Sequence, residues 1–390
     1  MASDMIFTSE SVTSGHPDKL CDQISDAAID AFLRQDAGAR AAVECAVATG
    51  VVFLAARFAA DAAIDLPALA RNVIADVGYV DGRFDARSCS ILTSLAELPI
   101  EMRDPPPAAL DDETIDRCFA HDQANVFGYA CRETPELMPL PISLAHRLAR
   151  AVDQARGAEL PWLSPDTKTQ VSVEYRGSRP VRIHGISLTA AVEPETPGAE
   201  VEERLRAVAL DALSGCEVKP DARTDIHINA GGPYEIGGPA RHAGLTGRKN
   251  GIDTYGEIAR QSGAALSGKD PSRIDRTGAY AARHAAKNIV AAGLAERCEV
   301  HLAYAIGQAR PLSLSVESFG TGRRQDDVIG RRLAAVLDFR PAAIAHRFGL
   351  RTRSAADGGF YRPLAVYGHF GRTDLDLPWE ATEIAAALRD

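Results

Sequence analysis

Apolar and polar residues alternate in three stretches of this 390-residue chain, and a helical period follows each of them. The first stretch places Val43, Cys45 and Val47 on one side of a strand before the chain turns at Thr49-Gly50. Alternation followed by a 3.6-residue period is typical of a β-hairpin with a helix packed on one face. The predicted hairpins, each with its helix, are 43–56 with 67–77, 171–188 with 200–213, and 300–316 with 326–337. The pattern therefore predicts an α+β fold of three similar layers, each burying one sheet face under helices.

A further amphipathic helix is predicted from Lys19 to Leu33, with Asp22, Asp26 and Asp30 on its polar side. The segment Gly15-His16-Pro17-Asp18-Lys19 forms its start, and proline is favoured at the first helical position because its missing N–H costs nothing there. His16 then caps or precedes the helix, and Asp18 and Lys19 lie in its first turn beside the positive end of the helix dipole. That arrangement suits a phosphate group and its metal ion. An ordinary capped helix with solvated charges would explain the same residues.

Two segments interrupt the periodic pattern. Residues 98–120 are rich in proline and acidic side chains, which is typical of a mobile surface loop such as a lid, or of a plain linker. Residues 231–251 are rich in glycine and contain the adjacent bases Arg248 and Lys249. Glycines let backbone N–H groups approach an anion closely, although a basic turn is the plainer interpretation. The run lacks the Gly-Lys-Ser/Thr ending of a P-loop, so a Walker-type site is excluded.

Composition narrows the class of protein. The apolar fraction of 46% and the charged fraction of 25% are globular values. A net charge of −10 argues against a general nucleic-acid binder or a binder of anionic membranes. The seven cysteines show no CxxC spacing, which favours a reduced cytosolic protein over a disulfide framework or a zinc site. With no signal-like start and no apolar run of membrane-spanning length, we expect a cytoplasmic protein.

Two more segments combine bases with carboxylates. Residues 267–276 hold Lys269 and Arg273 four positions apart, and residues 164–170 place Asp166 and Lys168 at the entrance to the second hairpin, where an exposed turn would also explain them. Bases suit phosphate oxygens, and carboxylates are hard ligands for Mg²⁺. Together these loops predict a metal–polyphosphate site. Its residues are the bases Lys168, Arg248, Lys249, Lys269 and Arg273 and the carboxylates Asp18 and Asp275.

The chain resembles the methionine adenosyltransferase family, which makes S-adenosylmethionine, along nearly its whole length. The segments that carry the resemblance are 7–12 with 15–19, Phe127-Gly128-Tyr129-Ala130, Leu160-Pro161-Trp162-Leu163, 244–249, Ser267-Gly268-Lys269-Asp270, 279–295 and 367–372. The resemblance implies three similar α+β domains about a pseudo-threefold axis. The implied units are an N-terminal domain at 1–101, a mobile active-site loop at 102–121, a central domain at 122–235 and a C-terminal domain at 236–390. It also implies a homodimer with active sites at the interface, and possible pairing of dimers into a tetramer.

The resemblance further implies an ATP-dependent adenosyl transfer. A thioether sulfur attacks C5′ of ATP and expels triphosphate, which is then cleaved to pyrophosphate and phosphate. Such a leaving group needs electrostatic stabilisation by Mg²⁺ and fixed bases. By the resemblance, His16 lies near the breaking bond, and the bases that hold the triphosphate are Lys168, Arg248, Lys249, Lys269 and Arg273. Asp122 binds ATP, Asp166 binds the ribose and Tyr234 stacks on the adenine. The metal ligands are Asp18 and Asp275 for two Mg²⁺ ions and Glu44 for K⁺.

Three departures from the family pattern fall in the acceptor subsite. Arg57 stands where the family has a glutamate that holds the amino acid's ammonium, Leu98 replaces a glutamine, and His242 replaces an aspartate. Arg57 would repel a substrate ammonium, and a desolvated like-charge contact costs several kcal/mol. One hypothesis is therefore an acceptor other than L-methionine, either lacking the ammonium or offering a carboxylate. A divergent methionine adenosyltransferase with compensating changes, and a non-catalytic nucleotide-binding or regulatory homologue, are the alternatives.

Overall fold

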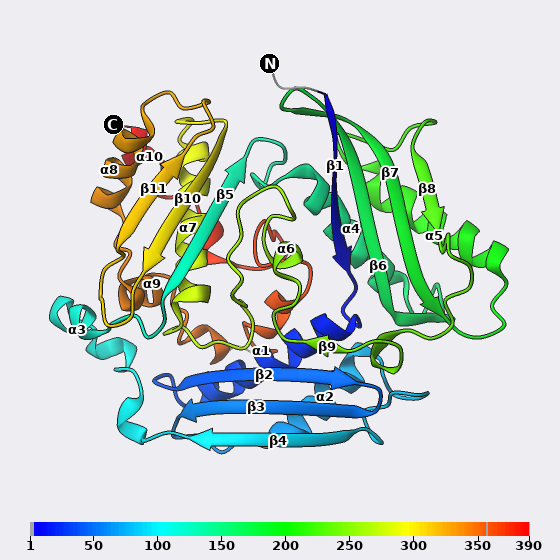
Figure 1. Ribbon diagram of the computed structural model, residues 1–390, viewed down its shortest axis with the longest axis horizontal. Helices are drawn as coiled ribbons and strands as arrows, with labels where there is room; N and C mark the ends of the chain where they lie inside the picture. Colours follow the sequence, from blue (N-terminus) through cyan, green and yellow to red (C-terminus); the bar gives the residue numbers. More distant parts are fainter. Residues whose placement is uncertain (1–3, 356–357, 390) are drawn as a thin grey trace.

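The structure, a computed structural model, describes residues 4–355 and 358–389. Its strands form three sheets around a common centre, and helices cover one face of each sheet (Figure 1). In sheet order the strands are β1 (Met5–Val12), β6 (Leu163–Arg176), β7 (Arg179–Val192) and β8 (Asp225–Ile228); β11 (Ser313–Glu317), β10 (Arg297–Tyr304) and β5 (Ala124–Cys131); and β4 (Ser90–Glu97), β3 (Val51–Ala59), β2 (Arg40–Ala48) and β9 (Gly244–Leu245). The predicted α+β fold of three similar units is confirmed.

All three predicted hairpins form, and a helix follows each. The pairs are β2–β3 with α2 (Leu66–Val77), β6–β7 with α5 (Gly198–Ser214), and β10–β11 with α8 (Asp326–Val336). Local signals fix the ends of α2. The Asp65 carboxylate accepts the N–H of Ala68, and Gly78 ends the helix at φ 109°, a left-handed conformation that glycine adopts without strain.

The three sheets exchange strands. β1, from the start of the chain, pairs antiparallel with β6, and β5 pairs with β10, more than 150 residues later. The short strand β9 extends the first sheet by pairing with β2. Each sheet therefore takes strands from distant parts of the chain, and boundaries at 101, 121 and 235 remain a prediction.

Three long helices fill the space between the sheets: α1 (Pro17–Gln35), α4 (Leu140–Ala155) and α7 (Ile274–Ala291). α7 lies so close to β5 that a Cβ on Gly128 would be 1.9 Å from the carbonyl carbon of Ala282, which explains the glycine in Phe127-Gly128-Tyr129. The shorter helices are α3 (Asp112–Arg117), α6 (Asn250–Asp253), α9 (Pro341–Arg347) and α10 (Ala385–Arg389). Within the described ranges, no helix combines the length and apolar character that crossing a bilayer requires.

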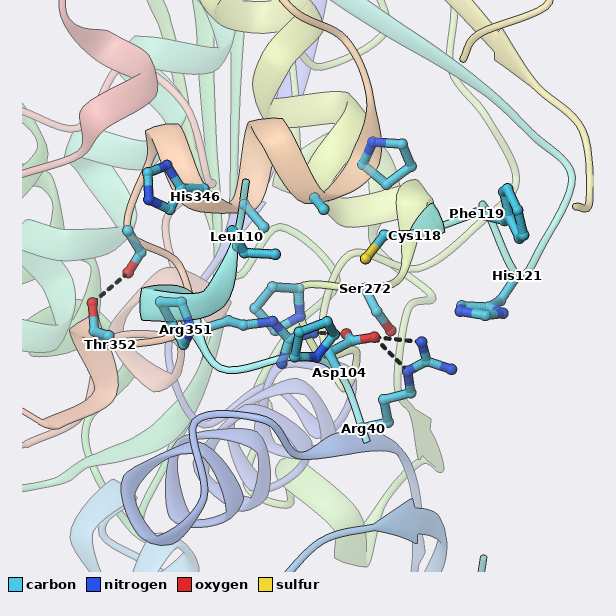
Figure 2. A pocket seen from close by; sticks show the side chains of 17 residues that line it. Arg40, Asp104, Leu110, Cys118, Phe119, His121, Ser272, His346, Arg351 and Thr352 are labelled. Atoms are coloured by element: carbon cyan, nitrogen blue, oxygen red, sulfur yellow. Dashed lines mark hydrogen bonds and ion pairs between the residues drawn. The ribbon is translucent and has the colours of Figure 1, made fainter. Parts of the chain in front are cut away.

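The segment 98–120 is tied to the C-terminal unit by ion pairs, although most of its residues are exposed. The Arg340 guanidinium binds Asp112 and Asp116 of this segment, at 2.6 and 2.9 Å. Asp104 forms ion pairs with both Arg40 and Arg351, and Figure 2 shows it between them at the edge of a cavity of about 180 Å³. The mobility of 102–121 stays a prediction, and these ion pairs are the contacts that an opening movement would have to break.

Glu380 provides a pH test of the C-terminal core. Burial acts to raise its pKa, but Arg283 and Lys287, at 2.9 and 2.7 Å, lower the pKa to about 2. A carboxylate with a depressed pKa stabilises the fold above its unfolded pKa and loses that contribution as the pH falls. We expect the difference in melting temperature between the wild type and Glu380→Gln to be constant above about pH 5 and to narrow steadily below it. A difference independent of pH down to pH 3 would contradict the assignment.

Candidate active site

The start of α1 has the predicted geometry. His16 is its N-cap, Nδ1 accepts the N–H of Asp18 at 3.2 Å, and Pro17 follows at the first helical position. The glycine-rich segment lies directly against this turn, since a Cβ on Gly244 would be 2.2 Å from the carbonyl carbon of Pro17. Asp18 is 2% exposed, and Arg248 Nε and Lys249 Nζ lie 3.6 and 3.5 Å from its two oxygens. The structure therefore brings together one predicted metal ligand and two predicted phosphate-binding bases.

The expected polar side of α1 is buried, not solvated. The carboxylates of Asp22, Asp26 and Asp30 are 0%, 0% and 3% exposed, and each binds backbone N–H groups of a C-terminal segment. Asp18 accepts the N–H of Leu245, and Asp22 accepts the N–H of Gly247. Asp26 accepts the N–H of Gly268. Asp30 accepts the N–H groups of Phe360, Tyr361 and Arg362. We call these four residues the aspartate row. Their four-residue spacing keeps them on one helix face, where they hold three loops in place.

Lys19 also differs from its expected place beside the phosphate site. Its side chain is fully buried, where its ammonium is 2.9 Å from Asp22 and also pairs with Asp253. Burial alone would lower its pKa, but these two carboxylates raise it. Lys19 is therefore committed to the helix packing.

A second group of predicted residues lies around the start of α7. Lys269 Nζ is 2.7 Å from Asp275 in the first turn of that helix, and Arg273 pairs with Asp122. Asp270, which flanks them in the sequence, instead accepts the N–H of Ala41 at 2.9 Å and is 1% exposed. That bond ties the loop to the edge of β2. The structure thus brings Lys269, Arg273, Asp275 and Asp122 together.

A third group forms around Asp166, which is 1% exposed. Its Oδ2 accepts from the N–H of Gly238 at 2.8 Å and lies 3.2 Å from both the Tyr234 hydroxyl and His242 Nε2. Burial acts to raise the pKa of Asp166, but the bond to His242 and the proximity of His16 hold it below its usual range. Burial lowers the pKa of His16 to about 4, against the influence of Asp166 and Asp18, so this imidazole is neutral at pH 7.

Four predicted residues stand apart from these groups: Lys168, Glu44, Arg57 and Leu98. Each side chain of the first three is exposed, and among the described residues no hydrogen bond or ion pair joins these three to the groups above. The strand register nevertheless places Arg57 near the second group. Arg57 pairs with Ala42, and Ala42 pairs with Lys269, so Arg57 and Lys269 share one face of the sheet about two strand spacings, or ~10 Å, apart.

Comparison with known proteins decides the family. Three family models match in order: the S-adenosylmethionine synthetase N-terminal domain at residues 4–99, its central domain at 117–234 and its C-terminal domain at 236–381. The chain belongs to the S-adenosylmethionine synthetase family. It is 48% identical to the S-adenosylmethionine synthase of Synechococcus sp. (strain JA-3-3Ab) over 403 residues, covering 99% of this chain and 97% of the relative. It is 47% identical to that of Microcystis aeruginosa (strain NIES-843 / IAM M-2473) over 409 residues, covering 100% and 98%. The resemblance described from the sequence is thereby confirmed.

Some residues of this synthetase-family site carried no signal in the sequence. The Arg241 guanidinium lies 4.8 Å from the centre of the Tyr234 ring and covers one of its faces. The Tyr79 hydroxyl donates to the backbone oxygen of Gly15 at 2.6 Å and so holds the turn before His16. A tyrosine at the end of a helix and an arginine in a basic loop are ordinary surface residues in a sequence. Only the fold brings them to the site.

Proposed function

We propose that this protein makes S-adenosylmethionine, or a close sulfonium analogue, from ATP and a thioether. The observation that supports the proposal is the pairing of acids with bases. Asp18 lies between Arg248 and Lys249, and Asp275 pairs with Lys269. Carboxylates and cations held in this way can separate on binding a metal–triphosphate, the carboxylates taking the metal and the cations taking the phosphate oxygens.

The donor set fits the metals that the family implies. Asp18 and Asp275 supply carboxylate oxygens, which Mg²⁺ prefers, and Glu44 offers an exposed carboxylate for K⁺. When bound, Mg²⁺ would neutralise charge on the departing triphosphate. Lys168, Arg248, Lys249, Lys269 and Arg273 would hold the triphosphate oxygens in place as the C5′–O5′ bond breaks. Such preorganised charges lower the barrier because they do not have to reorient during the reaction.

The remaining residues position the nucleoside. Asp166 would accept hydrogen bonds from the ribose hydroxyls, and Tyr234 would stack on the adenine. Asp122 would contact ATP beside its partner Arg273. His16, neutral and buried next to Asp166, would lie near the breaking bond and donate a hydrogen bond to the leaving oxygen.

The test of this function is turnover. The protein would be incubated with ATP, Mg²⁺ and K⁺, with and without methionine and a panel of other thioethers, and the sulfonium product and inorganic phosphate would be measured. We expect a thioether-dependent product in one-to-one ratio with ATP consumed. No turnover with any thioether would contradict the proposal and leave the non-catalytic alternative, which the two relatives described above, both named S-adenosylmethionine synthase, do not support.

We propose that Arg57, Leu98 and His242 form a rebuilt acceptor subsite. Two carboxylates of the family pattern are replaced by basic side chains, and Arg57 lies on the face that carries Lys269. An acceptor carboxylate would be attracted to Arg57, whereas an acceptor ammonium would be repelled. The acceptor is therefore a thioether that presents its carboxylate to this face, methionine in an altered orientation or an analogue without the ammonium.

The double variant Arg57→Glu/His242→Asp tests this subsite. We expect kcat/KM for methionine to rise about tenfold or more relative to analogues lacking the ammonium, because a like-charge contact becomes an attractive one. The measurement is a competition between the two substrates in one reaction. Arg179→Glu makes the same substitution as Arg57→Glu on an exposed strand end, and this control should leave the ratio unchanged. An unaltered ratio in the double variant would count against the assignment.

We propose that the chain forms a homodimer through the uncovered face of the sheet β4-β3-β2-β9, and that dimers can pair into tetramers. Leu92, Phe53, Ala46 and Leu245 stand directly opposite one another on the four strands. Leu92, Phe53 and Leu245 are 54%, 42% and 44% exposed. An apolar row across a whole sheet face is typical of a protein–protein interface. Because Glu44 and Arg57 lie on this face, a partner there would complete the active site.

Phe53→Glu is expected to shift the protein to a monomer, since it places a charge at the centre of the apolar row. Light scattering after gel filtration would compare its mass with that of the wild type, expected at twice the chain mass of 41.6 kDa or a multiple of it. Ile306→Glu, at a 64% exposed position in the β10–β11 turn, is the control that should leave the mass unchanged. A monomeric wild type would refute the interface.

A further inference from the structure

Three side chains from three separate segments converge at the start of α1. His16, Asp166 and His242 each offer a nitrogen or oxygen atom, and these atoms lie within 4.8 Å of one another. Within the described ranges this is the one such group of histidine, cysteine and carboxylate side chains. His16 is 3% exposed and Asp166 is 1% exposed, while His242 reaches the site from the glycine-rich loop. The group is therefore buried on two sides and accessible from one.

Asp166 supplies an independent indication that the group lacks a ligand. Its Oδ2 already has three neighbours, the N–H of Gly238, the Tyr234 hydroxyl and His242 Nε2. Its Oδ1 is buried and has no hydrogen-bond partner among the described residues. A buried carboxylate oxygen without a partner is costly, so its presence points to a cation or donor that the site is built to receive.

The distances suit a small divalent ion. Zn²⁺ binds histidine nitrogen and carboxylate oxygen at about 2.0–2.2 Å, which puts two ligands of a tetrahedral ion about 3.3 Å apart. His242 Nε2 and Asp166 Oδ2 are 3.2 Å apart. We propose that His16, Asp166 and His242 form a binding site for a divalent transition-metal ion such as Zn²⁺ or Co²⁺, with one coordination position left open to solvent or ligand.

The ligand atoms of this site differ from those of the Mg²⁺ site expected at Asp18 and Asp275. Imidazole ligands favour Zn²⁺ and Co²⁺, whereas Mg²⁺ prefers oxygen ligands alone. A metal on His16 Nε2 would move the ring proton to Nδ1, which would then no longer accept the N–H of Asp18 and would lie 3.8 Å from Asp18 Oδ2. Metal binding does not rest on the proposed reaction, but an ion here would occupy the oxygens of Asp166 that the ribose would need.

The test is Co²⁺ binding by chelator-treated full-length protein, without ATP or acceptor and with excess Mg²⁺. Visible absorption would report nitrogen and oxygen ligation of Co²⁺, and the absence of a sulfur-to-cobalt charge-transfer band would exclude binding by cysteines. We expect one ion per chain, displaced by Zn²⁺. His242→Gln and Asp166→Asn should each weaken binding at least about tenfold, because each removes a ligand. His227→Ala, at an exposed position on β8, is the control that should bind as the wild type does.

A second measurement tests the consequence for ATP. At a Zn²⁺ concentration ten times its Kd, the apparent Kd for ATP should rise about tenfold in the wild type and remain unchanged in His242→Gln. Circular dichroism would establish that the variants are folded. Failure of Co²⁺ to bind the wild type, or binding unchanged in both His242→Gln and Asp166→Asn, would overturn the metal site. A protein that binds Co²⁺ but makes no sulfonium product would refute the proposed function and leave the metal site standing.

Discussion

Lys269→Met is expected to lower kcat by about a hundredfold or more, the range seen when one preorganised electrostatic contact to a developing negative charge is removed. Lys269 Nζ is 2.7 Å from Asp275 and only partly exposed, so its charge is held in place before any phosphate arrives. Methionine keeps the length and apolar stem of the lysine but not its charge. Because the triphosphate gains charge as it leaves, kcat should fall further than the affinity for ATP. Steady-state kinetics with varied ATP would separate the two effects.

Two variants control for this result. Lys269→Arg keeps the positive charge and should retain more activity than Lys269→Met, although arginine differs in shape. Lys219→Met makes the same change at an exposed position before β8 and should leave kcat unchanged. If Lys269→Met lowered the affinity for ATP but left kcat intact, the side chain would bind the ground state and transition state equally, and its proposed role would be wrong.

Asp26→Asn is expected to destabilise the fold by about 3–5 kcal/mol, the cost of breaking a buried ion pair by removing one charge. Asp26 accepts two bonds from the Arg276 guanidinium, at 2.6 and 2.8 Å, and a third from the N–H of Gly268. Both charged side chains are 0% exposed, so the arginine left behind has no water to solvate it. Urea unfolding followed by circular dichroism would measure the loss.

The matched control is another aspartate in an ion pair with arginine. Asp327 is paired with Arg331 at 2.8 Å, but the two side chains are 60% and 71% exposed. Asp327→Asn should change the free energy of unfolding by less than about 1 kcal/mol, since exposed ion pairs contribute little. Equal losses in Asp26→Asn and Asp327→Asn would mean that burial does not set the value of the Asp26–Arg276 pair.

Periodicity predicted the hairpins and their helices because those elements depend on neighbours in the sequence. The exchange of strands between sheets was not predictable in the same way. β5 contains the motif Phe127-Gly128-Tyr129, but nothing local indicates that its partner is β10. The spacing of Asp22, Asp26 and Asp30 was visible, yet the usual rule that acidic residues face solvent led to the wrong environment. Their true partners are backbone N–H groups, which no sequence pattern records.

The candidate site was also predicted only in part, because contacts between distant segments leave no local pattern in the sequence. Arg248 and Lys249 reach Asp18 because both segments are fixed by close backbone approaches that their glycines indicated. Arg57 and Glu44 could be assigned to strands, but their distance from the other groups depends on the register of three strands. The contact of His242 with Asp166 joins two loops whose relative position the chain alone does not specify.

The aspartate row fixes the distances between the loops that carry the candidate site residues. From Asp18 to Asp26 the helix rises about 12 Å, and the anchors at Leu245 and Gly268 are set apart by that rise. A single residue inserted between these positions would turn the later carboxylates by about 100° and detach their loops without changing any candidate site residue. The length of this helix segment should therefore resist insertion and deletion more strongly than the loops it positions.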